Sequence, residues 1–117
     1  MARITPLFSS SKGNSYYIGN QKSGILVDCG ASYAQIKTAM ALCGYDINAV
    51  KGVFITHEHS DHIKGLKVLQ KNCKVPIFAS NKTLEYLISN ELVYCENELY
   101  TVEKPSTVAG MEIKSFH

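Results

Sequence analysis

Short apolar runs alternate along this chain with longer segments whose apolar residues recur at helical spacing. Runs at residues 24–28, 50–56 and 75–79 have the length and branched side chains of buried strands, and helical patterns lie between them. This alternation is typical of a sheet whose parallel strands are connected through helices. A hairpin pattern comes first, so the sheet should also contain antiparallel strands. The sequence therefore predicts an α/β fold whose sheet is mixed (α+β).

Turn residues and helix caps divide the rest of the chain. We expect strands at 3–8 and 16–18 to form the hairpin through a polar turn at 9–15. A second turn is expected at 20–23, before the strand at 24–28. Ser32 predicts the start of a helix that ends at Gly44, with Tyr33, Ile36, Met40 and Cys43 on its apolar face. A second helix is expected at 63–72, a third after an N-cap at Asn81, and strands at 99–102 and 111–116 around a turn near Pro105 and Gly110.

Size and composition favour one domain spanning residues 1–117. The chain has 117 residues, is 45% hydrophobic and 19% charged, and carries a formal charge of +2, which is too small to indicate nucleic acid or an anionic membrane by itself. No apolar run approaches the roughly 20 residues that a membrane span needs, and the first residues do not resemble a signal peptide. We therefore expect no membrane partner and a cytoplasmic location. The four widely spaced cysteines are expected to be reduced thiols.

The unusual chemistry is concentrated directly after the strand at 50–56. Three histidines and an aspartate occur within six residues, as His57, His59, Asp61 and His62. Alternate side chains of an extended segment point to the same side, so His57 and His59 can reach one ion. A lone histidine at a strand end is usually a polar surface residue, but this density of imidazole and carboxylate suits zinc, iron or manganese.

The pattern His-x-His-x-Asp-His after an apolar strand resembles the signature of the metallo-β-lactamase-fold hydrolases. An earlier apolar strand that ends in Asp28, Cys29 and Gly30 resembles the upstream Asp motif of that superfamily. The polar segment 9–15 and the stretch 57–65 are similar to the YycJ/WalJ branch, bacterial cytoplasmic proteins regarded as DNA exonucleases. The resemblance covers the whole chain but only the N-terminal half of such a protein, an αβ/βα sandwich.

The resemblance implies a role for each motif residue. His57 and His59 would bind a first divalent transition-metal ion (Zn²⁺ or Mn²⁺, or Fe), and Asp61 and His62 a second. Asp28 would accept a hydrogen bond that orients a metal-binding imidazole or the loop that carries it. A hydroxide held by the two ions would attack the substrate, with Asp61 as metal ligand and catalytic proton acceptor.

The ligand set is nevertheless incomplete, because family members supply further His and Asp ligands from their C-terminal half. The one histidine beyond the motif is His117, a weaker candidate because the next ligand in that branch lies a few residues after such a strand. A catalytic zinc normally has three protein ligands. We therefore interpret the chain as a truncated domain that is inactive alone, and expect self-association through an unprotected sheet surface.

Lysines offer a weaker indication of the substrate. Lys64, Lys67 and Lys71 recur at spacings of three and four in the expected helix, where they could contact a phosphate backbone or DNA. An ordinary solvated helix face explains the same pattern more simply. The leading interpretation is a metal-dependent phosphodiesterase, specifically a DNA exonuclease. The alternatives are an acyl hydrolase of the same fold, acting on thioesters or lactones, and a non-catalytic metal-binding fragment.

Overall fold

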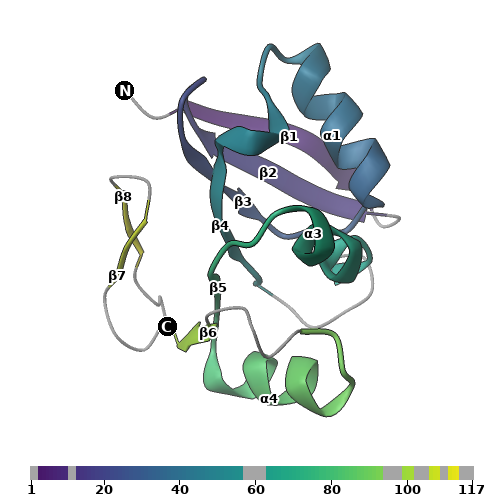
Figure 1. The fold of residues 1–117 in the computed structure, drawn as a ribbon, viewed down its shortest axis with the longest axis vertical. Coiled ribbons are helices and arrows are strands. Elements are labelled where there is room, and N and C mark those ends of the chain that lie inside the picture. The colour runs from purple at the N-terminus through teal and green to yellow at the C-terminus, as the bar shows by residue number, and fades with distance from the viewer. Residues whose placement is uncertain are drawn as a thin grey trace.

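A computed structural model of the chain describes residues 3–10, 13–56, 63–93, 99–101, 106–108 and 111–113 (Figure 1). In chain order the elements are β1 (Arg3–Ser10), β2 (Gly13–Gly19), β3 (Gly24–Val27), α1 (Tyr33–Leu42), η1 (Ile47–Ala49), β4 (Val50–Phe54), α3 (Leu66–Asn72), β5 (Ile77–Ala79), α4 (Asn81–Ser89), β6 (Leu99–Thr101), β7 (Ser106–Val108) and β8 (Met111–Ile113). None of the helices in these ranges has the length and apolar character needed to cross a membrane.

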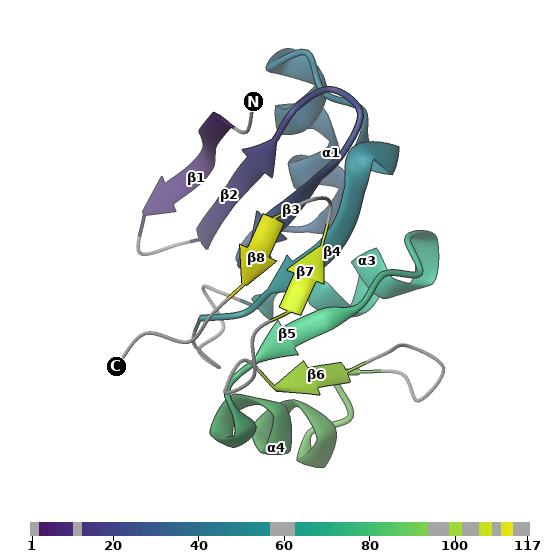
Figure 2. The ribbon, with the colours of Figure 1, turned by 90° about the vertical axis from the view of Figure 1, so that its left-hand side faces the viewer.

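The strands form a six-stranded sheet in the order of the sequence and a separate two-stranded sheet of β7 and β8. The pairs β1–β2 and β2–β3 are antiparallel, whereas β3–β4, β4–β5 and β5–β6 are parallel. Figures 1 and 2 show α1 and α3 on one face of the large sheet and the β7–β8 hairpin on the other. The predicted mixed α/β architecture is confirmed.

The hairpin strands are longer than their polar sequence suggested. Ser9 pairs with Asn14 and Ser10 with Gly13, so most of the predicted turn at 9–15 belongs to β1 and β2. The β-ladder is formed by backbone groups, which allows polar residues to continue a strand where one face is exposed. The second turn is where it was expected, since the Asn20 side-chain oxygen accepts from the backbone N–H groups of Lys22 and Ser23.

Helix α1 begins and ends as its capping residues predict. The Ser32 hydroxyl oxygen accepts from the Gln35 backbone N–H, and the Gln35 side chain accepts from the Ser32 N–H, which forms a capping box. Gly44 has φ of +87°, the left-handed conformation that favours glycine at a helix end. Cys43 is exposed rather than part of the buried face, because α1 has already ended at Leu42.

Two other helix boundaries differ from prediction. Helix α3 begins at Leu66, and Gly65 is its N-cap, because the Gly65 N–H donates to the Cys29 carbonyl outside the helix. Lys64 therefore precedes α3. The N-cap of α4 is Ser80 instead of Asn81, since the Ser80 hydroxyl accepts from the Thr83 N–H at 3.2 Å.

The strands near the C-terminus also depart in part from the sequence pattern. β5 starts directly after Pro76, which has no backbone N–H to donate to the ladder, and lies between β4 and β6 inside the sheet. Strands β6 and β8 lie within the expected ranges 99–102 and 111–116, of which residues 102 and 114–116 lie outside the described residues. β7 occupies part of the region where only a turn was expected, while Pro105 and Gly110 lie outside the described residues.

The main core lies between the sheet and the helices. Its fully buried side chains include Tyr17, Leu26, Ile36, Met40, Val53, Leu66, Leu69, Ile77 and Leu87. Tyr17 contacts the Tyr45 ring with a centroid distance of 4.7 Å and donates a hydrogen bond to the Asn20 carbonyl. A smaller cluster on the opposite face comprises buried Ile25 and Phe78, with Ile18, Val27 and Phe54 partly buried. The sheet is therefore apolar on both faces.

Candidate active site

The carboxyl ends of β3 and β4 meet at one edge of the sheet because the two strands are parallel neighbours. Asp28 directly follows β3, and its backbone N–H donates to the Phe54 carbonyl at 2.8 Å. Ile55 and Thr56 follow β4, and His57 comes next in the sequence. The structure thus brings Asp28 next to the start of the predicted metal-binding motif.

The Asp28 carboxylate binds Thr56 through both of its oxygens. Oδ1 accepts from the Thr56 backbone N–H at 2.7 Å, and Oδ2 accepts from the Thr56 hydroxyl at 2.6 Å. Hydrogen bonds to an ionised acceptor are short and strong, and Asp28 is only 3% exposed. Its φ of +66° is a conformation in which Asp is enriched over most other residues. These contacts fix the backbone immediately before His57.

The loop of residues 28–31, which we call the β3 loop, contacts two further segments. The Ser15 hydroxyl donates to the Asp28 carbonyl at 2.8 Å, and the Gly30 N–H donates to the Asn14 carbonyl at 2.8 Å. On another side, the Gly65 N–H donates to the Cys29 carbonyl at 2.7 Å. The β3 loop therefore joins β2, the end of β4 and the start of α3.

Cys29 is next to Asp28 but is not suited to bind a metal or act as a nucleophile. Its side chain is fully buried, and burial, together with the charge of Asp28, raises the pKa of the thiol far above its ordinary value. Metal binding and nucleophilic attack both require the thiolate. Cys29 and Cys73 are buried free thiols and Cys43 is an exposed one. This agrees with the expectation of reduced cysteines, while Cys95 lies outside the described residues.

The predicted metal ligands His57, His59, Asp61 and His62 lie outside the described residues, as does His117. Their roles therefore stay predictions. In the part of the chain that the structure describes, no group of three or more His, Cys, Asp or Glu side chains could hold a metal ion. Asp28 binds Thr56, and burial raises the pKa of the Cys29 thiol, so the donors predicted for a metal site at this edge are those of segment 57–62.

The sequence pattern predicts a role for Asp28 but not for the residues around it. It places Thr56 at the end of a strand, and Ser15 and Gly65 at turn or motif positions without a role. The signal available was that Thr56 and Gly65 flank segment 57–62 directly. Nothing in the sequence indicated that both of them contact the β3 loop.

The three lysines are all exposed, but they do not form one helical face. Lys67 and Lys71 are four residues apart on α3, whereas Lys64 lies in the turn before it. The helix expected at 63–72 is interrupted at residues 64 and 65, where the Gly65 N–H is bonded to the β3 loop. The predicted single stripe is wrong, although all three ammonium groups remain accessible to a partner.

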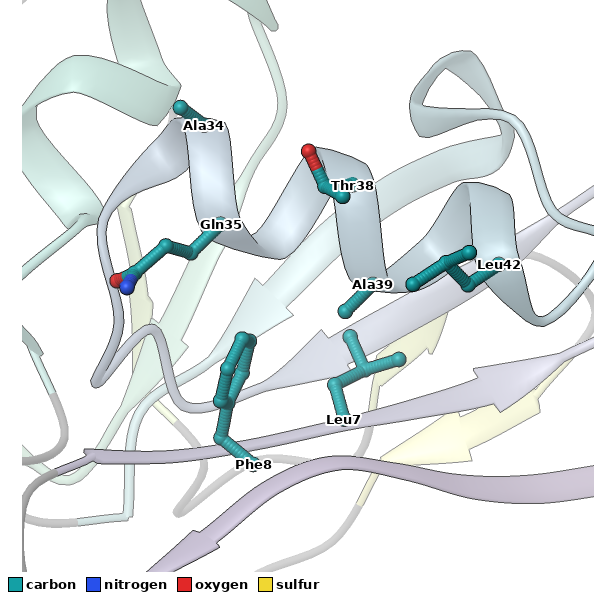
Figure 3. Close-up of a pocket in the computed structure, with 7 residues that line it drawn as sticks. All are labelled: Leu7, Phe8, Ala34, Gln35, Thr38, Ala39 and Leu42. Atoms are coloured by element: carbon teal, nitrogen blue, oxygen red, sulfur yellow. The ribbon is translucent and has the colours of Figure 1, made fainter.

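A groove of about 480 Å³ lies between β1 and α1, away from this chemistry. Figure 3 shows its lining side chains, which are Leu7, Phe8, Ala34, Gln35, Thr38, Ala39 and Leu42. These lining residues carry no carboxylate, imidazole or thiol. The groove therefore offers no ligands for a transition metal, and the candidate site stays at the ends of β3 and β4.

The chain is similar in sequence and in fold to several known proteins. The exodeoxyribonuclease YycJ of Bacillus anthracis is 37% identical over 113 residues, which cover 94% of this chain and 42% of that protein. The exodeoxyribonuclease WalJ of Streptococcus pneumoniae is 31% identical over 114 residues, with the same coverage. The chain thus spans about two fifths of the length of these curated relatives. In a crystal structure of the metallo-beta-lactamase SMB-1, the match has a TM-score of 0.71 at 17% identity and covers 97% of this chain and 48% of that one.

The family model of the metallo-beta-lactamase superfamily matches residues 11–114. This match includes β2, the Asp28 position, the His and Asp motif and the strands that follow. The mixed sheet agrees with the fold of the solved structure. The chain belongs to the metallo-beta-lactamase superfamily.

Proposed function

We propose that this chain is part of a metal-dependent hydrolase that cleaves phosphodiester bonds, with DNA ends as the substrate. The observation that carries the proposal is the pair of hydrogen bonds from Thr56 to the buried Asp28 carboxylate, directly before the His and Asp cluster. Membership of the superfamily supports hydrolysis, and the two relatives named as exodeoxyribonucleases support a nucleic-acid substrate.

The metal ligands in this proposal are His57 and His59 for one ion and Asp61 and His62 for a second. Imidazole and carboxylate donors fit Zn²⁺, Mn²⁺ or Fe better than Ca²⁺ or Mg²⁺. When bound, such ions lower the pKa of a water molecule and neutralise charge on a phosphoryl oxygen. Asp61 would also accept a proton, and Asp28 would orient the motif through Thr56. The protein's own contribution is thus to place the donors and the proton acceptor.

The chain is proposed to supply only part of this site. Two protein ligands for each ion are fewer than the three that catalytic zinc sites normally use. His117 is the one further histidine, and we keep it as the weaker candidate ligand. We therefore expect the 117-residue chain alone to bind metal weakly and to lack turnover, and expect the complete gene product that contains it to be active.

The proposal also includes contacts with DNA, self-association of the isolated chain and a cellular location. The exposed ammonium groups of Lys64, Lys67 and Lys71 would contact the phosphate backbone of DNA. The sheet face opposite α1 and α3, where Ile18, Val27 and Phe54 are only partly buried, would allow the isolated chain to self-associate. The protein would work in the cytoplasm, where an enzyme that degrades DNA would meet its substrate.

Metal binding is tested by titrating the purified chain with Co²⁺ and recording its visible absorption spectrum. We expect the spectrum of nitrogen- and oxygen-bound Co²⁺ in the wild-type chain and its loss in His57→Ala, His59→Ala and His62→Ala. His117→Ala is the matched histidine control and should leave the spectrum largely unchanged. A wild-type spectrum that all three motif variants retain would contradict the proposed ligands.

The substrate is tested on the complete gene product with Mn²⁺ or Zn²⁺. End-labelled linear DNA should be degraded, covalently closed circular DNA should not, and Asp61→Asn should abolish degradation. A thioester and a lactone are included in the same panel. Hydrolysis of these acyl substrates without degradation of DNA would overturn the nuclease proposal in favour of an acyl hydrolase.

A further inference from the structure

Described residues on either side of segment 57–62 contact one short loop, the β3 loop. We infer that Gly65 and Thr56 are positioning residues for segment 57–62, and that each acts by direct contact with the β3 loop. The inference rests on the proposed function, because it takes segment 57–62 to be the metal-binding segment. It adds that the spacing of the donors is set by the β3 loop from outside the motif.

On the upstream side, the contact is made by hydrogen bonds. Thr56 donates its backbone N–H and its hydroxyl to the two oxygens of Asp28, at 2.7 and 2.6 Å. Asp28 itself is fixed through its own backbone, since its N–H donates to Phe54 and its carbonyl accepts from the Ser15 hydroxyl. The Asp28 side chain, which binds Thr56, therefore extends from a backbone whose N–H and carbonyl groups are both hydrogen-bonded.

On the downstream side, the contact depends on the absence of a side chain. The Gly65 N–H donates to the Cys29 carbonyl at 2.7 Å, and a Cβ at Gly65 would lie 2.1 Å from the Ala31 carbonyl oxygen. The neighbouring atoms are backbone atoms, so no flexible side chain can move aside. Gly65 has φ of −92° and ψ of −1°, which other residues also adopt. Glycine is thus required here for close approach and not for its conformational range.

The β3 loop cannot easily retreat from a larger residue at position 65. On its other side, the Gly30 N–H donates to the Asn14 carbonyl, and a Cβ at Gly13 would lie 2.9 Å from the Gly30 carbonyl oxygen. The loop is therefore packed closely between β2 and the start of α3. Any side chain at position 65 must therefore displace the start of α3, together with the residues that directly follow segment 57–62.

The test compares two Gly→Ala variants by Co²⁺ titration and by urea unfolding without metal. Gly65→Ala should weaken Co²⁺ binding at least tenfold and alter the visible spectrum. Gly44→Ala is the matched control: its φ of +87° makes alanine unfavourable, but a Cβ there meets no atom within 4 Å. It should lower the stability while keeping the wild-type spectrum and affinity.

A second pair of variants tests the upstream end independently, including the case in which Gly65→Ala does not fold. Thr56→Val removes the hydroxyl that binds Asp28 and should weaken Co²⁺ binding, whereas Thr56→Ser retains the hydroxyl and should restore it. If the wild type binds Co²⁺ and both Gly65→Ala and Thr56→Val bind it equally well with the same spectrum, the inference is wrong and the proposed function stands. If the wild type itself binds no Co²⁺, the proposed function fails, and the inference fails with it.

Discussion

Two strands of the large sheet lead into helices at the same edge, and their connections are built differently. β5 passes into α4 through Ser80 alone, whose hydroxyl caps the helix at the Thr83 N–H. β3 passes into α1 through five residues, and only the last of them, Ser32, caps the helix in the same way. The four preceding residues, the β3 loop, are not needed to begin α1.

The two connections use their polar groups for different purposes. In the β5 connection they serve the helix that follows. In the β3 loop, the Asp28 carboxylate and the Cys29 carbonyl accept hydrogen bonds from Thr56 and Gly65, which belong to other parts of the chain. A connection that contains more residues than its helix needs, and whose hydrogen bonds lead elsewhere, indicates a site rather than a simple helix start.

The largest expected effect comes from removing the Asp28 side chain. Asp28→Ala deletes the acceptor of two short hydrogen bonds and places alanine at φ of +66°. Buried hydrogen bonds to a charged group contribute about 1.5–3 kcal/mol each, so we expect a loss of about 3–6 kcal/mol in the free energy of unfolding, measured in urea.

Asp28→Asn is the matched variant, because asparagine tolerates positive φ and has the same shape. Its single amide oxygen can accept only one of the two hydrogen bonds, so its loss of stability should be intermediate. If both variants had the same free energy of unfolding as the wild type, the connections after β3 and β5 would differ in geometry but not in their contribution to stability.

The next effect is a dependence on alkaline pH that is specific to the β3 loop. Burial, and then the charge of Asp28, raises the pKa of the Cys29 thiol above its ordinary value of 9.0. The Cys29 thiol therefore loses its proton at a lower pH in the unfolded chain than in the folded chain. Its contribution to the free energy of unfolding is fully present below pH 9 and declines as the pH rises above that value. One such group lowers the free energy of unfolding by about 1.4 kcal/mol for each pH unit.

Urea unfolding between pH 8 and 10.5 measures this dependence when wild type is compared with Cys29→Ala. The difference in stability between the two proteins should narrow as the pH rises, because other groups titrate equally in both. Parallel pH profiles would show that the thiol is not held in its neutral form and that the β3 loop is open to solvent.

The smallest effect is expected at the β5 connection. Ser80→Ala removes the N-cap of α4 and should cost about 1 kcal/mol in the free energy of unfolding. Ser80→Asp retains a capping oxygen and should recover most of it. Neither variant should change Co²⁺ binding, since the Ser80 cap serves only its own helix. A changed Co²⁺ spectrum would mean that both connections contribute to the site.

The parts of the fold that follow from local patterns were predictable. The apolar run at β3, the capping box at Ser32 and the left-handed Gly44 each depend on residues within a few positions of one another. The N-cap of α4 was misplaced by one residue because Ser80 and Asn81 are both good caps, and only the strand end decides between them. The start of α3 was misplaced because Gly65 uses its N–H for the distant Cys29 carbonyl.

The α/β class, the apolar strands and a predicted donor set suited to transition metals follow from residue types and short-range periodicity in the sequence. In contrast, the hydrogen bonds between Asp28 and Thr56, 28 residues away, and the position of Gly65 against the β3 loop are visible only in the folded chain. Such contacts arise from the parallel pairing of β3 and β4 and from close packing of backbone atoms. Neither leaves a local pattern in the sequence.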